Sequence, residues 1–224
     1  MEVPDRTHSS IDLLWQKFQG GDDAVLGDLF QYVYRELYYY GLKLVFTPDV
    51  VKDTIQDIFA DIWSRRRKME RIRNIRGYLF VSLRRELLRR VKRVRKEGPL
   101  DERVISSFEF SKEDFIIREE RESEETRLLI QSLKRLTGRQ REVILLRFNH
   151  ELEFQEIALI LNMNIQSVRN LLFRALEKIR REMNSPGTGS APDVEMFLLT
   201  VFHQRRKHKL EVPDSSFLSE NYLT

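Results

Sequence analysis

The chain has 224 residues, of which 41% are hydrophobic and 33% charged, with a formal net charge of +4 and no cysteine. This length holds one or two small domains, and the lack of cysteine excludes disulfides and thiolate metal sites, as in proteins of a reducing cytosol. The N-terminus lacks the basic and apolar pattern of a secretory signal, and no apolar run approaches the roughly 20 residues that span a membrane.

Helical periodicity runs through the chain, and no segment alternates with the period of a strand. The first predicted helix has Ser10 as its cap and carries an apolar face of Ile11, Leu14, Trp15 and Phe18. Two glycines interrupt the pattern, and a second helix follows over residues 24–45. A third helix begins with Thr47 as its cap and Pro48 in its first turn. It is expected to bury Ile55, Ile58, Phe59, Ile62 and part of Trp63.

A strongly basic segment comes next, with a connection over 65–73 and a fourth helix over 74–96. From Arg65 to Lys96 the sequence has 15 Lys or Arg against two Glu, a net charge of +13. This excess points to a polyanion, either nucleic acid or an anionic membrane face, because a merely solvated helix normally interleaves both signs. Three aromatic residues accompany it; Trp63 and Tyr78 are candidates either for stacking on unpaired bases or for the core, and Phe80 is expected in the core.

The middle of the chain reverses this charge. Residues 97–127 contain 11 acidic and five basic residues, which indicates a flexible acidic linker. A second helical domain follows, in which Thr137 and Gln140 have the spacing of a capping box. Beyond it, residues 184–192 have the composition of a linker, and one amphipathic helix is expected at 193–203.

The stretch at 154–180 has the pattern of a helix-turn-helix. Ala158 is small enough for two helices to cross closely, Asn162 tolerates the left-handed conformation of a tight turn, and Asn164 is a good helix cap. The second helix presents polar groups suited to the base edges of a major groove, since Arg pairs with guanine and Asn or Gln with adenine. An ordinary helical hairpin with a polar outer face is the alternative.

Two helical domains in this order resemble a bacterial RNA polymerase sigma factor of the extracytoplasmic-function type, over residues 10–183. The resemblance rests on "DTIQDIFADIW", "RNIRGYLFVSLRRELLRRVKR" and "LTGRQREVILLRF…FQEIALILNMNIQSVRNLLFRALEKIR". It implies an all-α fold of two small domains joined by a flexible acidic linker. The implied organisation is an N-terminal tail at 1–9, sigma region 2 at 10–96, the acidic linker at 97–124, sigma region 4 at 125–183, and a linker and tail of unknown role at 184–224.

The resemblance also implies three sets of contacts. Core polymerase would be bound by Asp53, Gln56, Asp57 and the exposed parts of Phe59 and Trp63. The −10 element, where a base is flipped out and held, would be met by Arg73, Asn74, Tyr78, Arg84, Arg85 and Arg89. The −35 element would be read as duplex by Gln166, Ser167, Arg169, Asn170, Phe173 and Arg174.

The prediction is thus a sigma factor that binds core RNA polymerase and promoter DNA, recognises both promoter elements and promotes melting and initiation. It is not expected to be an enzyme, and no cofactor, metal or small-molecule substrate is implied. By family habit an anti-sigma factor, often membrane-bound, would keep this cytoplasmic, nucleoid-associated protein inactive at the inner membrane.

Three other classes of protein are weighed against this prediction. A stand-alone helix-turn-helix regulator that does not bind polymerase leaves the basic first domain unexplained. An enzyme acting on nucleic acid needs clustered carboxylates or a zinc site, and neither is found; His203 and His208 are read as parts of a solvated tail. A membrane-surface protein is disfavoured because the fourth helix is charged nearly all round.

Overall fold

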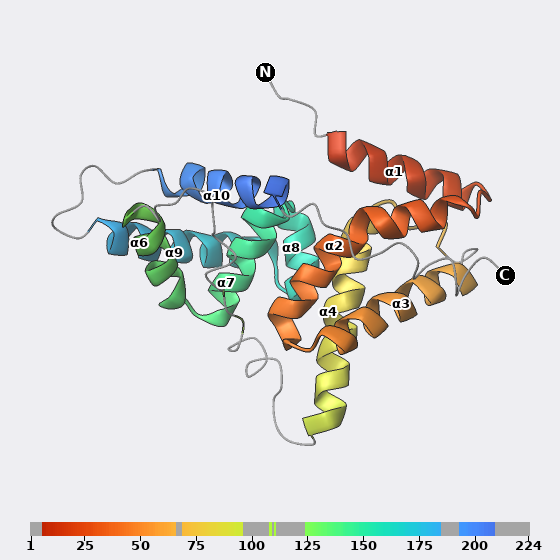
Figure 1. Ribbon diagram of the computed structural model, residues 1–224, viewed down its shortest axis with the longest axis horizontal. Helices are drawn as coiled ribbons and strands as arrows, with labels where there is room; N and C mark the ends of the chain where they lie inside the picture. The colour runs from red at the N-terminus through yellow and green to blue at the C-terminus, as the bar shows by residue number, and fades with distance from the viewer. Residues whose placement is uncertain are drawn as a thin grey trace. The chain divides into compact units, whose positions relative to one another are not determined.

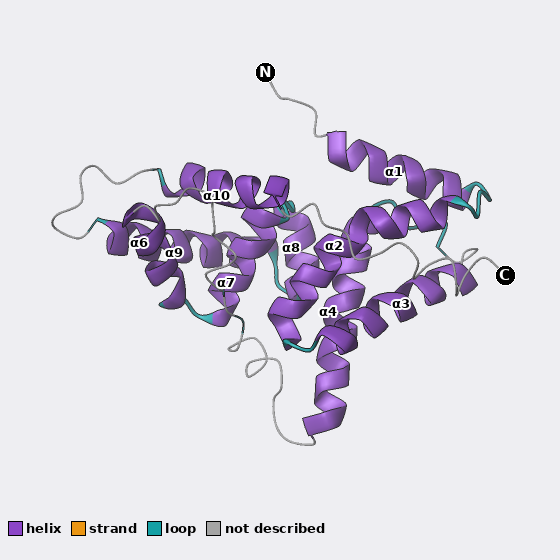
Figure 2. Ribbon diagram, in the orientation of Figure 1, coloured by secondary structure: helices purple, strands orange, loops and turns teal. Residues whose placement is uncertain are grey.

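The computed structural model describes residues 6–65, 69–95, 108, 110, 124–184 and 193–208. These residues form helices and turns, with no strand among them (Figure 1). Figure 2 shows the same helices, with short described loops between neighbours such as α2 and α3. The described helices fall into two compact units, divided between Lys96 and Glu97. The predicted all-α class is confirmed.

The described part of the first unit consists of three helices packed around a central one, α2. The helices are α1 (Arg6–Gln19), α2 (Val25–Val45), α3 (Pro48–Ser64) and α4 (Ile75–Arg95). Helix α2 packs against each of the other three, and its buried face includes Leu29, Val33, Leu37, Tyr40 and Leu44. The ring of Tyr40 lies 5.3 Å from that of Phe80 in α4, so Phe80 belongs to the core, as expected.

A glycine sets the distance between α2 and α3. A Cβ atom at Gly41 would lie 2.6 Å from Cγ1 of Val51, which is closer than real Cβ contacts come. Val51 is itself fully buried in α3, so its side chain has little room to move away. The side chain of Val51 therefore fills the space that any larger residue at position 41 would occupy.

Two helix starts in this unit differ from the predictions. Helix α1 begins at Arg6, so Ser10 lies inside the helix and is not its cap. Helix α3 begins at Pro48 as expected, but the Thr47 hydroxyl donates to the carbonyl of Val45 at 3.1 Å and accepts no helix N–H. Pro48 lacks an N–H in any case, and this lowers the number of donors at that end that need a partner.

The second unit is built around its longest helix, α9. Its elements are α6 (Glu124–Lys134), α7 (Gly138–Ile144), the π-helix η3 (Leu145–Asn149), α8 (Phe154–Leu161), α9 (Ile165–Met183) and α10 (Val194–His208). Helices α6, α7, α8 and α10 all pack against α9. The capping box at the start of α7 is confirmed, because Thr137 Oγ1 accepts from the Gln140 N–H and the Gln140 side chain accepts from the Thr137 N–H.

Helices α8 and α9 form the predicted helix-turn-helix. Asn162 ends α8 in the left-handed region, with φ 53° and ψ 52°, and Asn164 Oδ1 accepts from the Ser167 N–H at 2.7 Å. Ala158, at the crossing, is 5% exposed and its carbonyl accepts from the Met163 N–H. Each of these three residues does what the local pattern predicts.

The helix near the C-terminus is part of the second unit. Helix α10 runs to His208, five residues beyond its expected end, and packs against η3 and α9 through Val194, Leu198, Val201 and Phe202. Two aromatic residues from the region predicted as acidic linker are also buried: Phe110 lies 5.9 Å from both Phe202 and Phe108. The rest of residues 97–123, and with it the predicted flexibility, lies outside the described residues.

The packing of α10 predicts a difference between two neighbouring leucines. Leu198→Ala should lower the free energy of unfolding of the second unit by about 2–5 kcal/mol, because it leaves a cavity at a fully buried site. Leu199→Ala, on the 37% exposed adjacent residue, is the control and should cost far less. Urea unfolding of the full chain measures both, and equal effects would show that α10 does not pack on this unit.

Candidate nucleic-acid interface

The first part of α9 presents a polar face to solvent. Val168, Leu172 and Ala175 point into the unit, and the opposite side of the same turns is exposed. Ser167 is half-buried. The exposed residues among those predicted to read the −35 element are Gln166, Arg169, Asn170, Phe173 and Arg174. The structure therefore brings the whole predicted set together on one helix end, and the 64% exposed ring of Phe173 lies among the polar groups.

Two amides on this face are already paired. Gln166 Nε2 donates to Asn170 Oδ1 at 3.1 Å, across one helical turn. The pair leaves the Gln166 carbonyl oxygen as an acceptor and the Asn170 amide as a donor. This combination matches the donor and acceptor that adenine presents in the major groove. The hydrogen bond also restricts both side chains before any ligand arrives.

A phenylalanine beside the same face is in contact with two arginines. The guanidinium carbon of Arg169 is 5.3 Å from the centroid of the Phe154 ring, and that of Arg147 is 5.0 Å from it. Arg147, from η3, also donates to the carbonyl of Leu152 at 3.0 Å and lies 3.5 Å from a Glu153 carboxylate oxygen. Cation–π contacts of this kind hold a guanidinium against the ring. Arg169 is thus supported from α8, although it extends from α9.

Neither Phe154 nor Arg147 was predicted as a site residue. Phe154 is the first residue of α8, where an aromatic side chain looks like an ordinary start of an apolar helix. Arg147 lies in the π-helix η3, and Arg169 lies in α9. Periodicity within either helix does not show that the two side chains lie close together. Their contribution depends on how three elements pack, and the sequence alone gives no signal of it.

Residues 69–95 of the first unit, the described remainder of the predicted basic segment, contain the second candidate surface. Asn74 caps α4, because its Oδ1 accepts from the Gly77 N–H at 2.7 Å and its carbonyl from the Tyr78 N–H at 3.2 Å. Any Cβ at position 77 would lie 3.2–3.3 Å from the Asn74 side chain, so glycine suits the cap. The Tyr78 side chain, one turn into α4, is half-buried.

The predicted arginines of this surface differ in exposure. Arg73 and Arg85 are exposed, whereas Arg84 is only 5% exposed and lies in the interior of the unit. Arg89 is exposed and paired with Glu86 one turn earlier. The hydrogen bond from Arg89 lowers the pKa of Glu86, against the opposing effect of burial, so this carboxylate is charged at neutral pH. The prediction of Arg84 as a surface contact is not met.

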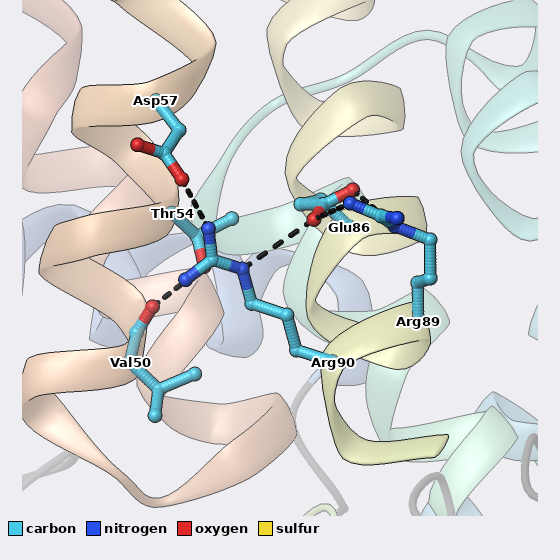
Figure 3. Close-up of polar contacts among 6 residues, drawn as sticks. All are labelled: Val50, Thr54, Asp57, Glu86, Arg89 and Arg90. Carbon is cyan, nitrogen blue, oxygen red and sulfur yellow. Dashed lines mark hydrogen bonds and ion pairs between the residues drawn. The ribbon is translucent and has the colours of Figure 1, made fainter. Parts of the chain in front are cut away.

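An ion pair joins helices α3 and α4. Figure 3 shows Arg90 of α4 reaching across to Asp57 of α3, with Glu86 on its other side. The Arg90 Nε atom lies 3.4 Å from Glu86 Oε1. Thr54 is buried nearby and donates to the carbonyl of Val50 at 2.6 Å. Asp57 was predicted as a site residue and Arg90 was not. The structure shows that the two side chains form an ion pair.

The residues of α3 predicted to bind polymerase fall into two groups. Asp53 is exposed, Gln56 is half-buried, and the Asp57 side chain retains 68% of its exposure despite its ion pair. Trp63 is 48% exposed, and its ring lies 6.4 Å from that of Phe18. Phe59, however, is 4% exposed and packs edge-on against Phe30 at 5.0 Å. Phe59 therefore belongs to the core, and the expected exposed part is absent.

Within the described residues, no group of three or more His, Cys, Asp or Glu side chains is arranged to hold a metal ion. Among the same residues, none of the helices combines the length and the apolar character needed to cross a membrane.

Comparison with known proteins finds similar proteins that are named as sigma factors. Residues 126–179 match the family described as Sigma-70, region 4. Over 181 residues the chain is 20% identical to proteins named ECF RNA polymerase sigma factor SigK from Mycobacterium bovis and Mycobacterium tuberculosis, covering 80% of this chain and 97% of each relative. A solved structure of the sigma factor RpoE in complex with the anti-sigma factor NepR from Bartonella quintana matches at 20% identity and a TM-score of 0.47, over 70% of this chain and 95% of that one.

The region 4 match extends from α6 into α9 and so contains the whole helix-turn-helix. The similarity to the SigK proteins extends further, over four fifths of the chain. Residues 126–179 thus match Sigma-70, region 4, and over four fifths of its length the chain is similar to proteins named as ECF RNA polymerase sigma factors.

Proposed function

We propose that the chain binds core RNA polymerase, directs it to promoters through their −35 and −10 elements, and promotes melting and initiation. The observation that carries this proposal is the exposed face of α9, where polar groups that the fold does not use lie together inside a Sigma-70 region 4 match. Such groups have the donors and acceptors that major-groove recognition needs.

Reading of the −35 element is assigned to the exposed side chains of α9. Arg169 is the candidate for a bidentate contact with guanine, and the Gln166–Asn170 pair for a contact with adenine. Phe173 offers an apolar ring to a thymine methyl group. Ser167 and Arg174, at the edges of this face, are assigned to the neighbouring backbone or bases.

Contact with the −10 element is assigned to the start of α4. Arg73 and Arg85 are exposed cations for the phosphates, and the half-buried Tyr78 offers a ring to an unpaired base. Asn74 holds the helix start through its hydrogen bond to the Gly77 N–H, and Arg89 acts with its charge partly balanced by Glu86. Arg84 is left out of this set because it is buried.

Binding of core polymerase is assigned to the exposed side of α3, through Asp53, Gln56, Asp57 and Trp63. Phe59 is left out because it is buried. By analogy with the family, an anti-sigma factor, often membrane-bound, covers these faces and keeps the protein inactive. The protein then acts in the cytoplasm, as a binding subunit and not as an enzyme. A regulator that uses only the helix-turn-helix is the alternative, and no contact in the structure favours it.

A reconstituted transcription assay tests the proposed function. Purified bacterial core polymerase, the full chain and a library of promoter fragments are mixed, and the transcripts are sequenced. We expect initiation at a small promoter set, only when the chain is present. If no initiation occurs and the chain does not co-purify with core polymerase, the proposal is wrong. Salt-sensitive binding to a −35 duplex without polymerase would then favour the stand-alone regulator.

Base reading by Arg169 predicts a specific loss of affinity. Arg169→Ala should cost about 1–3 kcal/mol at a selected promoter and relax the sequence preference at one −35 position. Arg181→Ala, an exposed arginine three turns further along α9, is the matched control and should leave the preference unchanged. Fluorescence anisotropy with single-base variants of the −35 duplex measures both. An equal loss on every sequence would identify Arg169 as a phosphate contact only.

The stack on Phe154 predicts a smaller effect of the same kind. Phe154→Leu should weaken specific −35 binding by about 0.5–1 kcal/mol, because Arg169 loses the ring that holds its guanidinium. Phe154→Tyr keeps a ring at this position and should bind like the original protein. The same anisotropy assay measures both variants. Unchanged affinity in Phe154→Leu would mean that the stack does not order Arg169.

A further inference from the structure

Side chains at the end of α1 hold the turn that leads into α4. Trp15 Nε1 donates to the carbonyl of Ile72 at 2.7 Å. Gln19 Nε2 lies within hydrogen-bond distance of three carbonyls of the same turn: Met69 at 3.0 Å, Ile72 at 3.2 Å and Glu70 at 3.3 Å. These contacts join residues 50 to 57 positions apart in the chain. Loop carbonyls on a protein surface are commonly left to water, so four contacts from two side chains make an unusual concentration.

The two donors are themselves well placed. Trp15 is 1% exposed and its ring stacks on that of Phe18 at 5.5 Å, so the indole N–H is fixed by the core. Gln19 is the last residue of α1. Two residues later, Gly21 lies in the left-handed region, at φ +102°. Glycine takes this conformation readily, and the chain changes direction there. The Gln19 side chain lies beside the Met69–Ile72 turn.

The turn is fixed at its other end too. The Ile72 N–H donates to the Met69 carbonyl at 3.0 Å, and Asn74 caps α4 two residues later. Met69 and Ile75, on either side, are buried. Between these fixed points, Arg71 and Arg73 are exposed. The backbone is thus held from the inside, and two guanidinium groups face outward.

We propose that Gln19 and Trp15 are positioning residues for the −10 contact: they fix the carbonyls of the Met69–Ile72 turn so that Arg71, Arg73 and the start of α4 keep the geometry that the unpaired strand needs. The inference rests on the proposed function and deepens it, because it assigns a role in promoter recognition to α1. Gln19 carries most of this role, since a single amide contacts three carbonyls.

The test compares two glutamines of α1. Gln19→Met keeps the length of the side chain but removes its donors, and Gln16→Met makes the same change at an exposed position one turn earlier. Each full-length variant is assembled with core polymerase. Its affinity is then measured for a single-stranded −10 oligonucleotide and for a −35 duplex, both taken from the promoter found in the library assay.

The Gln19→Met holoenzyme should bind the −10 strand about fivefold to tenfold more weakly, as the loss of one or two hydrogen bonds implies. Its affinity for the −35 duplex should not change, and Gln16→Met should match the original protein on both. Hydrogen exchange of the Arg71–Asn74 amides in the free protein should be faster in Gln19→Met. A merely structural role would instead weaken core assembly and both DNA elements together.

Two results would overturn the inference. One is a Gln19→Met holoenzyme that binds the −10 strand as Gln16→Met does; the other is an equal loss on both elements. Failure of the proposed function looks different, because the original protein would then give no initiation with core polymerase. In that case the exchange measurement still decides whether Gln19 fixes the turn.

Discussion

Both candidate DNA surfaces start at a helix N-terminus that is closed by an asparagine. Asn74 accepts from the Gly77 N–H and Asn164 from the Ser167 N–H, each at 2.7 Å. A cap fixes the direction of the first turn and satisfies a backbone donor that would otherwise need water. The side chains that extend from that turn then have a defined origin. The side chains of α4 and α9 that we propose to contact DNA depend on these two hydrogen bonds, because most of them are too exposed to be positioned by burial.

Exposed cations need a fold that tolerates them. In α4 two arginines are paired with carboxylates: Arg76 with Glu36 of α2 at 2.9 Å, and Arg90 with Asp57 of α3 and with Glu86. Partly buried pairs of this kind lose much of their value when one partner is removed. The outer arginines are left for a polyanion. A helix that the sequence shows only as a block of positive charge is therefore two-sided in its electrostatics.

Local chemistry made the helix-turn-helix predictable. The small Ala158, the turn residue Asn162 and the cap Asn164 act within a few residues of one another, so the sequence contains all that is needed. The residues that were missed or misplaced depend on distant partners. Gly41 matters because of Val51, Phe154 because of Arg169, and Gln19 because of a turn 50 residues away. Phe59 and Arg84 entered the contact sets through the family resemblance alone; helical spacing had already placed Phe59 in the core, and both side chains are buried.

The aromatic contact between Phe110 and Phe202 also bears on how the protein is made. The two rings pack in the same unit, yet more than the entire helix-turn-helix lies between them in the chain. During synthesis, α6 to α9 emerge from the ribosome before α10 exists, and the apolar surface that α10 covers stays open until then. Closing so long a loop is also slow compared with forming a helix. The second unit therefore completes its packing only after α10 has been made, and in that interval its uncovered surface is open to chaperones.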